Sequence, residues 1–311
     1  MQNYDCNYNY SYRHWIEAIR PKTLTAAIAP VILGATLALV EIKDRVNFTS
    51  VVIIIITLIT ALLLQITTNL INDYYDFLSG VDGDDRLGPK RVTQSGLIAA
   101  EKVKRAFSIT IALSLFLGMI LVAAQGGIVI LIIGVLSIVF AWAYTAGPIP
   151  LSHIALGELL ALIFFGPVAV AGTYYLITQK FNFSVILCGL GVGSISSAIM
   201  AINNIRDLNS DINKGKKTLA VIFGEKFGRV LPIFFVIISF LIPIIYFLAT
   251  SSSVRSYIII LSMFCLLLYF KDIWRGILKD PIDCRFNNFL ACTGKYLFFY
   301  SILFSIGVII V

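Results

Sequence analysis

The stretch that decides this fold is residues 65–96, QITTNLINDYYDFLSGVDGDDRLGPKRVTQSG. It begins inside an uncharged apolar run, and the polar side chains where that run ends are Asn69, Asn72, Asp73 and Asp76. Carboxylates at the mouth of a membrane helix are energetically costly unless they have partners. Hard divalent cations prefer oxygen ligands. The stretch therefore predicts a membrane helix that ends in a metal-binding motif.

A second stretch, residues 203–217, repeats this pattern at the end of another apolar run and reads NNIRDLNSDINKGKK. On a helix, residues three or four apart share a face, which joins Asp73 to Asp76 and Asp207 to Asp211. Two acidic motifs, each followed by basic residues, predict one metal–diphosphate site. The four aspartates are the candidate catalytic residues, and the candidate Mg²⁺ ligands are Asn72, Asp73, Asp76, Asp207 and Asp211.

Basic and amide side chains follow both motifs. Arginine holds phosphate with two parallel hydrogen bonds, whereas lysine acts as a point charge. The alternative is that these residues only mark cytoplasmic loops, which are basic in any membrane protein. The candidate diphosphate ligands of the two loops are Lys90, Arg91, Gln94, Lys216 and Lys217.

Five more residues are candidates for binding substrate. Asn69, Asn204 and Arg206 belong to the acidic motifs themselves. Tyr144 starts a turn rich in proline, which is alternatively a tight connector. Glu158 is ionisable near the start of an apolar run, where such groups usually have a function, although it could instead reach water at the membrane interface.

Composition places the chain among polytopic membrane proteins. Of its 311 residues, 59% are hydrophobic and 13% are charged, whereas soluble domains carry about 25% charged residues. The net charge of +7 resides in short loops, so it reports membrane topology and we expect no nucleic-acid partner. The five cysteines form no CxxC pair, and we expect neither a disulfide framework nor a zinc site.

The apolar runs predict an all-α protein with nine transmembrane helices in a single domain, residues 1–311. A spanning helix needs about 20 apolar residues, and the uncharged run 106–153 is long enough for two, with a break at 125–127. The expected spans are 23–40, 51–71, the two halves of 106–153, 154–177, 185–205, 231–249, 257–270 and 288–311.

Charge asymmetry predicts the orientation. If the N-terminal segment 1–22 is cytoplasmic, the cytoplasmic segments hold 20 of the 24 Lys and Arg residues, as the positive-inside rule requires. Both acidic motifs then face the cytoplasm. Gly189, Gly193, Ser197 and Ala201 recur every four residues in one span, a pattern that predicts close helix packing.

Strings along most of the chain, from residue 20 to about residue 228, resemble the UbiA superfamily of intramembrane prenyltransferases, and most closely its members that act on 1,4-dihydroxy-2-naphthoate. Ile222 departs from the pattern, because arginine is common there. The strings are RPKTL, NLINDYYDFLSGVD, GPKRVTQSGLI, YTAGPIPL, GELLALIFFGPVAVAGTYY and NNIRDLNSDINKGKKTLAVIFG.

The resemblance implies nine helices around a central cavity that is open laterally to lipid. It implies Mg²⁺ held by the two acidic motifs and bridging to the diphosphate of a polyprenyl donor, with Arg91, Lys216 and Lys217 on the diphosphate. The expected reaction transfers the prenyl group to 1,4-dihydroxy-2-naphthoate, with loss of diphosphate and CO₂, and gives demethylmenaquinol for menaquinone. The expected location is the inner (cytoplasmic) membrane of the cell.

Three alternatives stay open from the residues. One is a related prenyltransferase with another aromatic acceptor, such as 4-hydroxybenzoate or a different dihydroxynaphthoate. Another is a secondary transporter, although transporter sites usually lie near the bilayer midplane and the charges here gather at one face. The third is a lipid-binding scaffold, which gives no reason for two acidic motifs.

Overall fold

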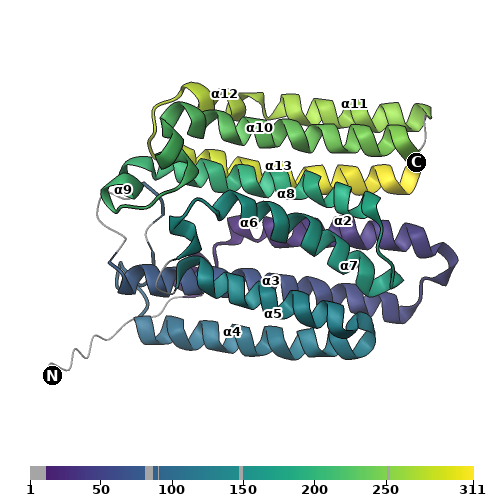
Figure 1. The fold of residues 1–311 in the computed structure, drawn as a ribbon, viewed down its shortest axis with the longest axis horizontal. Helices are drawn as coiled ribbons and strands as arrows, with labels where there is room; N and C mark the ends of the chain where they lie inside the picture. The colour runs from purple at the N-terminus through teal and green to yellow at the C-terminus, as the bar shows by residue number, and fades with distance from the viewer. Residues whose placement is uncertain (1–11, 81–86, 90, 147–149, 251–252) are drawn as a thin grey trace.

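The protein is a bundle of long helices that run along one common direction (Figure 1). The computed structural model describes residues 12–80, 87–89, 91–146, 150–250 and 253–311. The long helices and helix segments are α2 (Thr25–Ile42), α3 (Phe48–Leu78), α4 (Ala100–Leu121), α5 (Gly127–Thr145), α6 (Gly157–Ile163), α7 (Ala169–Thr178), α8 (Phe183–Arg206), α10 (Leu219–Thr250), α11 (Val254–Tyr269) and α13 (Phe286–Ile310).

Three short helices are α1 (Tyr12–Ile19), α9 (Leu208–Asn213) and α12 (Lys271–Lys279). Of these, α9 and α12 lie near one end of the bundle (Figure 1). The described residues form no strand and only one isolated β-bridge, between Ile154 and Lys217. The expected all-α class is therefore confirmed.

The described helices include seven stretches long and apolar enough to cross a membrane, or eight if the bent pair α11–α12 counts as one span. One of the seven, Ala100–Thr145, is 46 residues long, which is far more than a bilayer needs. The chain turns within it at Val122–Gly126, and α4 and α5 lie side by side (Figure 1). The total of nine spans and the cytoplasmic N-terminus stay predictions.

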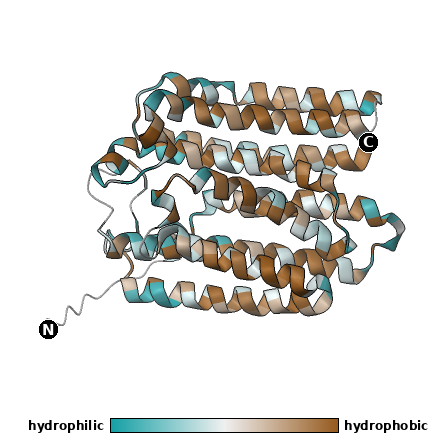
Figure 2. Ribbon diagram, viewed as in Figure 1, coloured by the Kyte–Doolittle hydropathy of each residue, from teal (hydrophilic) through white to brown (hydrophobic). Residues whose placement is uncertain are grey.

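The outer surface of the bundle is apolar. Large hydrophobic side chains such as Phe116 on α4, Ile128 on α5 and Phe234 on α10 are more than half exposed. Figure 2 shows hydrophobic residues along the helices and hydrophilic ones mainly at their ends. Exposed apolar faces of this extent suit lipid rather than water, which confirms a multi-pass membrane protein.

Helix α8 is the most buried of the candidate spans, with 72% of its apolar window inside the protein. It packs closely against the π-helical turn Phe164–Val168, which joins α6 to α7 and breaks the single helix expected over 154–177. A Cβ atom added to Gly193 would meet the Leu162 carbonyl oxygen at 2.2 Å. The expected close packing of the small-residue stripe is confirmed.

We expect Gly193→Ala to destabilise the protein by about 1–3 kcal/mol, because the added methyl group overpacks a rigid backbone contact. The melting temperature of the purified protein in detergent measures this. Gly118→Ala is the matched control, since a Cβ on Gly118 meets no heavy atom within 4 Å. Equal melting temperatures for the two variants would contradict the packing described for α8.

Candidate functional site

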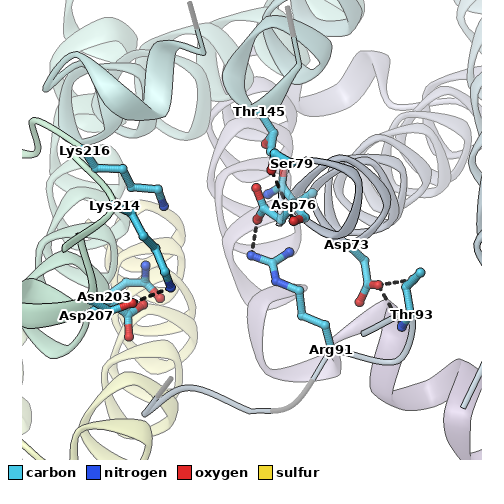
Figure 3. A network of polar contacts seen from close by, with 12 residues as sticks. Asp73, Asp76, Ser79, Arg91, Thr93, Thr145, Asn203, Asp207, Lys214 and Lys216 are labelled. Atoms are coloured by element: carbon cyan, nitrogen blue, oxygen red, sulfur yellow. Dashed lines mark hydrogen bonds and ion pairs between the residues drawn. The ribbon is translucent and has the colours of Figure 1, made fainter. Parts of the chain in front are cut away.

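A cavity of about 940 Å³ opens inside the bundle. Its walls come mainly from α2 to α8 and are largely apolar away from the acidic motifs. Both acidic motifs line it, although more than 120 residues separate them in the sequence. Figure 3 shows Asp73, Asp76 and Arg91 on one side and Asp207, Lys214 and Lys216 on the other. The structure therefore brings together the two motifs that the sequence singled out.

The first motif lies wholly on α3, which runs seven residues beyond the apolar run expected to end at residue 71. Asp73 and Asp76 are therefore about one helical turn apart, and both are more than 90% buried. Asp73 Oδ1 accepts hydrogen bonds from the Thr93 amide, at 3.1 Å, and from the Thr93 hydroxyl. Asp76 pairs with Arg91, so Arg91 and Thr93 both lie against the motif.

Asn72 and Asn69 have different surroundings. The Asn72 side-chain oxygen accepts a hydrogen bond from the Thr145 hydroxyl, which links α3 to the end of α5. Asn69 Nδ2 donates to the Ile19 carbonyl oxygen at 2.7 Å and to Thr23 Oγ1 at 3.0 Å. Both asparagines line the cavity, and the amide nitrogen of Asn69 anchors the chain that precedes α2.

The second motif straddles a helix break, since α8 ends at Arg206 and α9 begins at Leu208. The Asp211 amide still donates to the Asp207 carbonyl at 2.8 Å, so the two aspartates remain one turn apart. Arg206 holds both carboxylate oxygens of Asp207, at 2.8 Å from Nε and 2.6 Å from Nη2. The shared face expected for Asp207 and Asp211 survives the break.

Asp211 is 4% exposed, and burial raises the pKa of its carboxyl group above the ordinary value, an effect that the Lys216 ammonium opposes from 3.4 Å. A buried carboxylate favours its charged form when a cation is near. The donor set of the two motifs consists of oxygen atoms, which suits Mg²⁺. No cluster of three or more acidic, histidine or cysteine side chains is preformed among the described residues. Mg²⁺ commonly uses one or two carboxylates and completes its shell with water and phosphate oxygens, so this arrangement fits it.

The remaining candidate residues fall into two groups. Tyr144, Asn204, Arg206 and Lys216 line the cavity. The others do not line it or lie outside the described residues: Gln94, Glu158 and Lys217 are described but are not part of the lining, and Lys90 lies outside the described residues.

Glu158 and Lys217 do not line the cavity, but each contacts a residue or loop beside it. Glu158 is 2% exposed, and its Oε1 accepts a hydrogen bond from Asn204 Nδ2 at 2.9 Å. The Lys217 amide donates to the His153 carbonyl at 3.0 Å, which fastens the loop after the second motif to the loop after α5. Both residues therefore support the walls of the site.

Sequence reasoning missed several polar residues at the cavity. In the sequence, nothing marked Thr93 and Thr145 as site residues except that Thr93 lies near a motif and Thr145 lies in a turn. Lys214 lines the cavity and donates to Ser210 Oγ at 2.5 Å. Asn287 on α13 also lines it and lies in a region where the sequence shows no motif. Contacts of this kind arise from helix packing, which a single sequence does not reveal.

Comparison with known proteins gives the same picture. The model of the UbiA prenyltransferase family matches residues 27–302. The 1,4-dihydroxy-2-naphthoate octaprenyltransferase of Haemophilus influenzae is 34% identical over 97% of this chain and 97% of its own. That of Escherichia coli K12 is 40% identical over 69% of this chain and 70% of its own.

Solved structures share the fold at low sequence identity. A UbiA homologue from Archaeoglobus fulgidus, bound to DMAPP and Mg²⁺, is 15% identical with a TM-score of 0.65, over 96% of this chain and 99% of its own. A UbiA homologue from Aeropyrum pernix K1 has a TM-score of 0.64 at 14% identity, over 94% and 98%. With the family match over most of the sequence, these findings show that the chain belongs to the UbiA prenyltransferase family.

Proposed function

We propose that this protein transfers a polyprenyl group from polyprenyl diphosphate to 1,4-dihydroxy-2-naphthoate, releasing diphosphate and CO₂ and giving demethylmenaquinol for menaquinone synthesis. The observation that carries the proposal is a largely apolar cavity with two acidic motifs facing each other across it. The names of the Haemophilus influenzae and Escherichia coli relatives favour the naphthoate over 4-hydroxybenzoate as acceptor.

Asn72, Asp73, Asp76, Asp207 and Asp211 are the residues that would hold Mg²⁺. When bound, the ion supplies positive charge that compensates the negative charge developing on the departing diphosphate. A. fulgidus structures with Mg²⁺ and prenyl diphosphates support the same class of ligand here. The two motifs lie on opposite walls, so a ligand held by both spans the cavity.

The basic residues have two roles in this proposal. Arg91 and Lys216 neutralise Asp76 and Asp211 in the structure. A diphosphate with its cation would give the carboxylates a new counter-ion, and Arg91 and Lys216 would then bind phosphate oxygens. Lys90 and Lys217 belong to the same two loops and are proposed to add to the electrostatic attraction. Gln94 is proposed to donate a hydrogen bond from its amide.

The apolar part of the cavity protects the reacting carbon. Cleavage of the C–O bond leaves an allylic cation, and a dry cavity keeps water from capturing it. Tyr144, Phe140 and Phe164 line the cavity, and aromatic ring faces stabilise cations. The ring carbon that bears the carboxylate forms the new C–C bond, and the carboxylate leaves as CO₂ while its bonding electrons return to the ring.

The remaining site residues are proposed to orient the substrates. Asn204 lines the cavity while Glu158 holds its amide from behind. Arg206 holds Asp207, and Asn69 anchors the start of α2 against α3. The charged end of the cavity is proposed to face the cytoplasm from the inner membrane, with lipid around the bundle and the N-terminal segment 1–22 on the same side.

The first test is turnover by the purified protein with Mg²⁺, geranylgeranyl diphosphate and 1,4-dihydroxy-2-naphthoate, with 4-hydroxybenzoate in a parallel reaction. We expect prenylated naphthol and one CO₂ per product, and we expect EDTA to abolish both because the diphosphate loses its counter-ion. Mass spectrometry and CO₂ release measure the products. Product from 4-hydroxybenzoate alone would overturn the proposed acceptor.

The second test removes one carboxylate from each motif. Asp73→Asn and Asp207→Asn should each lower kcat/KM by about a hundredfold or more, because a lost metal ligand weakens stabilisation by several kcal/mol. Asp272→Asn, at an exposed position on α12, is the matched control and should keep full activity. Full activity in either variant, with an unchanged melting temperature, would show that its motif is not part of the active site.

A further inference from the structure

We infer that Asn287 is a positioning residue that ties the two acidic motifs together at the cavity and so fixes the spacing in which the diphosphate and its cation are bound. The inference rests on the proposed function, since it deepens the role of the same site. Asn287 is the second residue of α13 and lines the cavity. It lies about 80 residues after the second motif and 200 after Leu87.

The Asn287 side-chain amide makes two hydrogen bonds, one as donor and one as acceptor. Its Nδ2 donates to the Leu87 carbonyl oxygen at 2.8 Å, and its Oδ1 accepts from Arg206 Nη1 at 2.9 Å. A guanidinium can only donate and a carbonyl oxygen can only accept. The orientation of the amide is therefore fixed by its partners, and neither aspartate nor leucine can reproduce both bonds.

On one side, this tie holds the second motif. The Arg206 side chain is 3% exposed, and its other donors bind Asp207 and the Asn203 side-chain oxygen, the latter at 2.8 Å. The third nitrogen of the guanidinium, Nη1, donates to Asn287 Oδ1. With this bond lost, Nη1 of the buried guanidinium loses this partner, and the pair that Arg206 forms with Asp207 loses this link to α13.

On the other side, the tie holds the first motif. Leu87 lies four residues before Arg91 and six before Thr93. Arg91 pairs with Asp76, and Thr93 donates to Asp73. Leu87 is thus bonded to α13, and Arg91 and Thr93 are bonded to α3.

Hydrogen bonds therefore connect Asp207 through Arg206 and Asn287 to Leu87, which lies four residues before Arg91, the partner of Asp76. A ligand that binds both motifs needs their oxygen atoms at a fixed separation, and small misplacements of binding groups weaken such sites strongly. Asn287 therefore acts through its neighbours on the affinity for diphosphate and metal.

The test replaces Asn287 by leucine, which has a similar size and no hydrogen-bonding groups. We expect geranylgeranyl diphosphate to bind about fivefold to tenfold more weakly in the presence of Mg²⁺, as the loss of one to two net hydrogen bonds implies. The Mg²⁺ concentration for half-maximal binding should rise similarly, while the KM for the acceptor stays unchanged. Calorimetry on purified protein in lipid nanodiscs measures binding without turnover. Asn288→Leu, at the exposed neighbouring position, is the matched control and should bind like the wild type.

Asn287→Asp separates the two bonds, because a carboxylate still accepts from Arg206 but has no N–H for the Leu87 carbonyl. We expect it to bind diphosphate more weakly than the wild type, and it serves as the test if the leucine variant does not fold. Wild-type affinity in Asn287→Asp would overturn the tie between the motifs. If the wild type binds the diphosphate but prenylates no aromatic acceptor, the proposed function fails while the calorimetry still decides the role of Asn287.

Discussion

The site depends on ion pairs between buried aspartate carboxylates and basic side chains. Asp76 and Asp211 lie at the cavity with less than 10% of their surface exposed, and burying a charge without a partner costs several kcal/mol. Each is paired with a basic residue that follows it in sequence, Arg91 for Asp76 and Lys216 for Asp211. Asp207 is paired with its neighbour Arg206. These pairs offset the cost of burying the carboxylates, and a dication with a diphosphate would provide the same balance of charge.

Close packing of helices brings the two halves of the site together. Gly189 and Gly193 on α8 lie against the backbone of the turn at Gly166, where there is no room for a side chain. This contact holds α8 beside α6, where Glu158 binds Asn204 at the end of α8. The small residues on the apolar helix faces therefore also position the polar groups of the site, because they allow the helices to pack closely.

The loops beside the motifs behave as parts of the site rather than as linkers. Thr93 folds back onto Asp73, and the Lys217 amide bonds the loop after α5. Asn287 then connects the segment after the first motif to Arg206. Two of these contacts satisfy buried polar groups, the Asp73 carboxylate and the Arg206 guanidinium, as the scarcity of water at such a site demands.

The sequence by itself determined the all-helical membrane class, the two acidic motifs and the basic residues paired with them. Those features are local: apolar runs of membrane length, and carboxylates three or four residues apart on one helix face. It also anticipated the small-residue stripe on α8. Only the tertiary structure decided that Glu158 binds Asn204, that Thr93 and Thr145 bind the first motif, and that Asn287 binds both Arg206 and the Leu87 carbonyl. Those contacts join residues 20 to 200 positions apart, and their partners are fixed by how the helices pack, which the pattern of one chain does not encode.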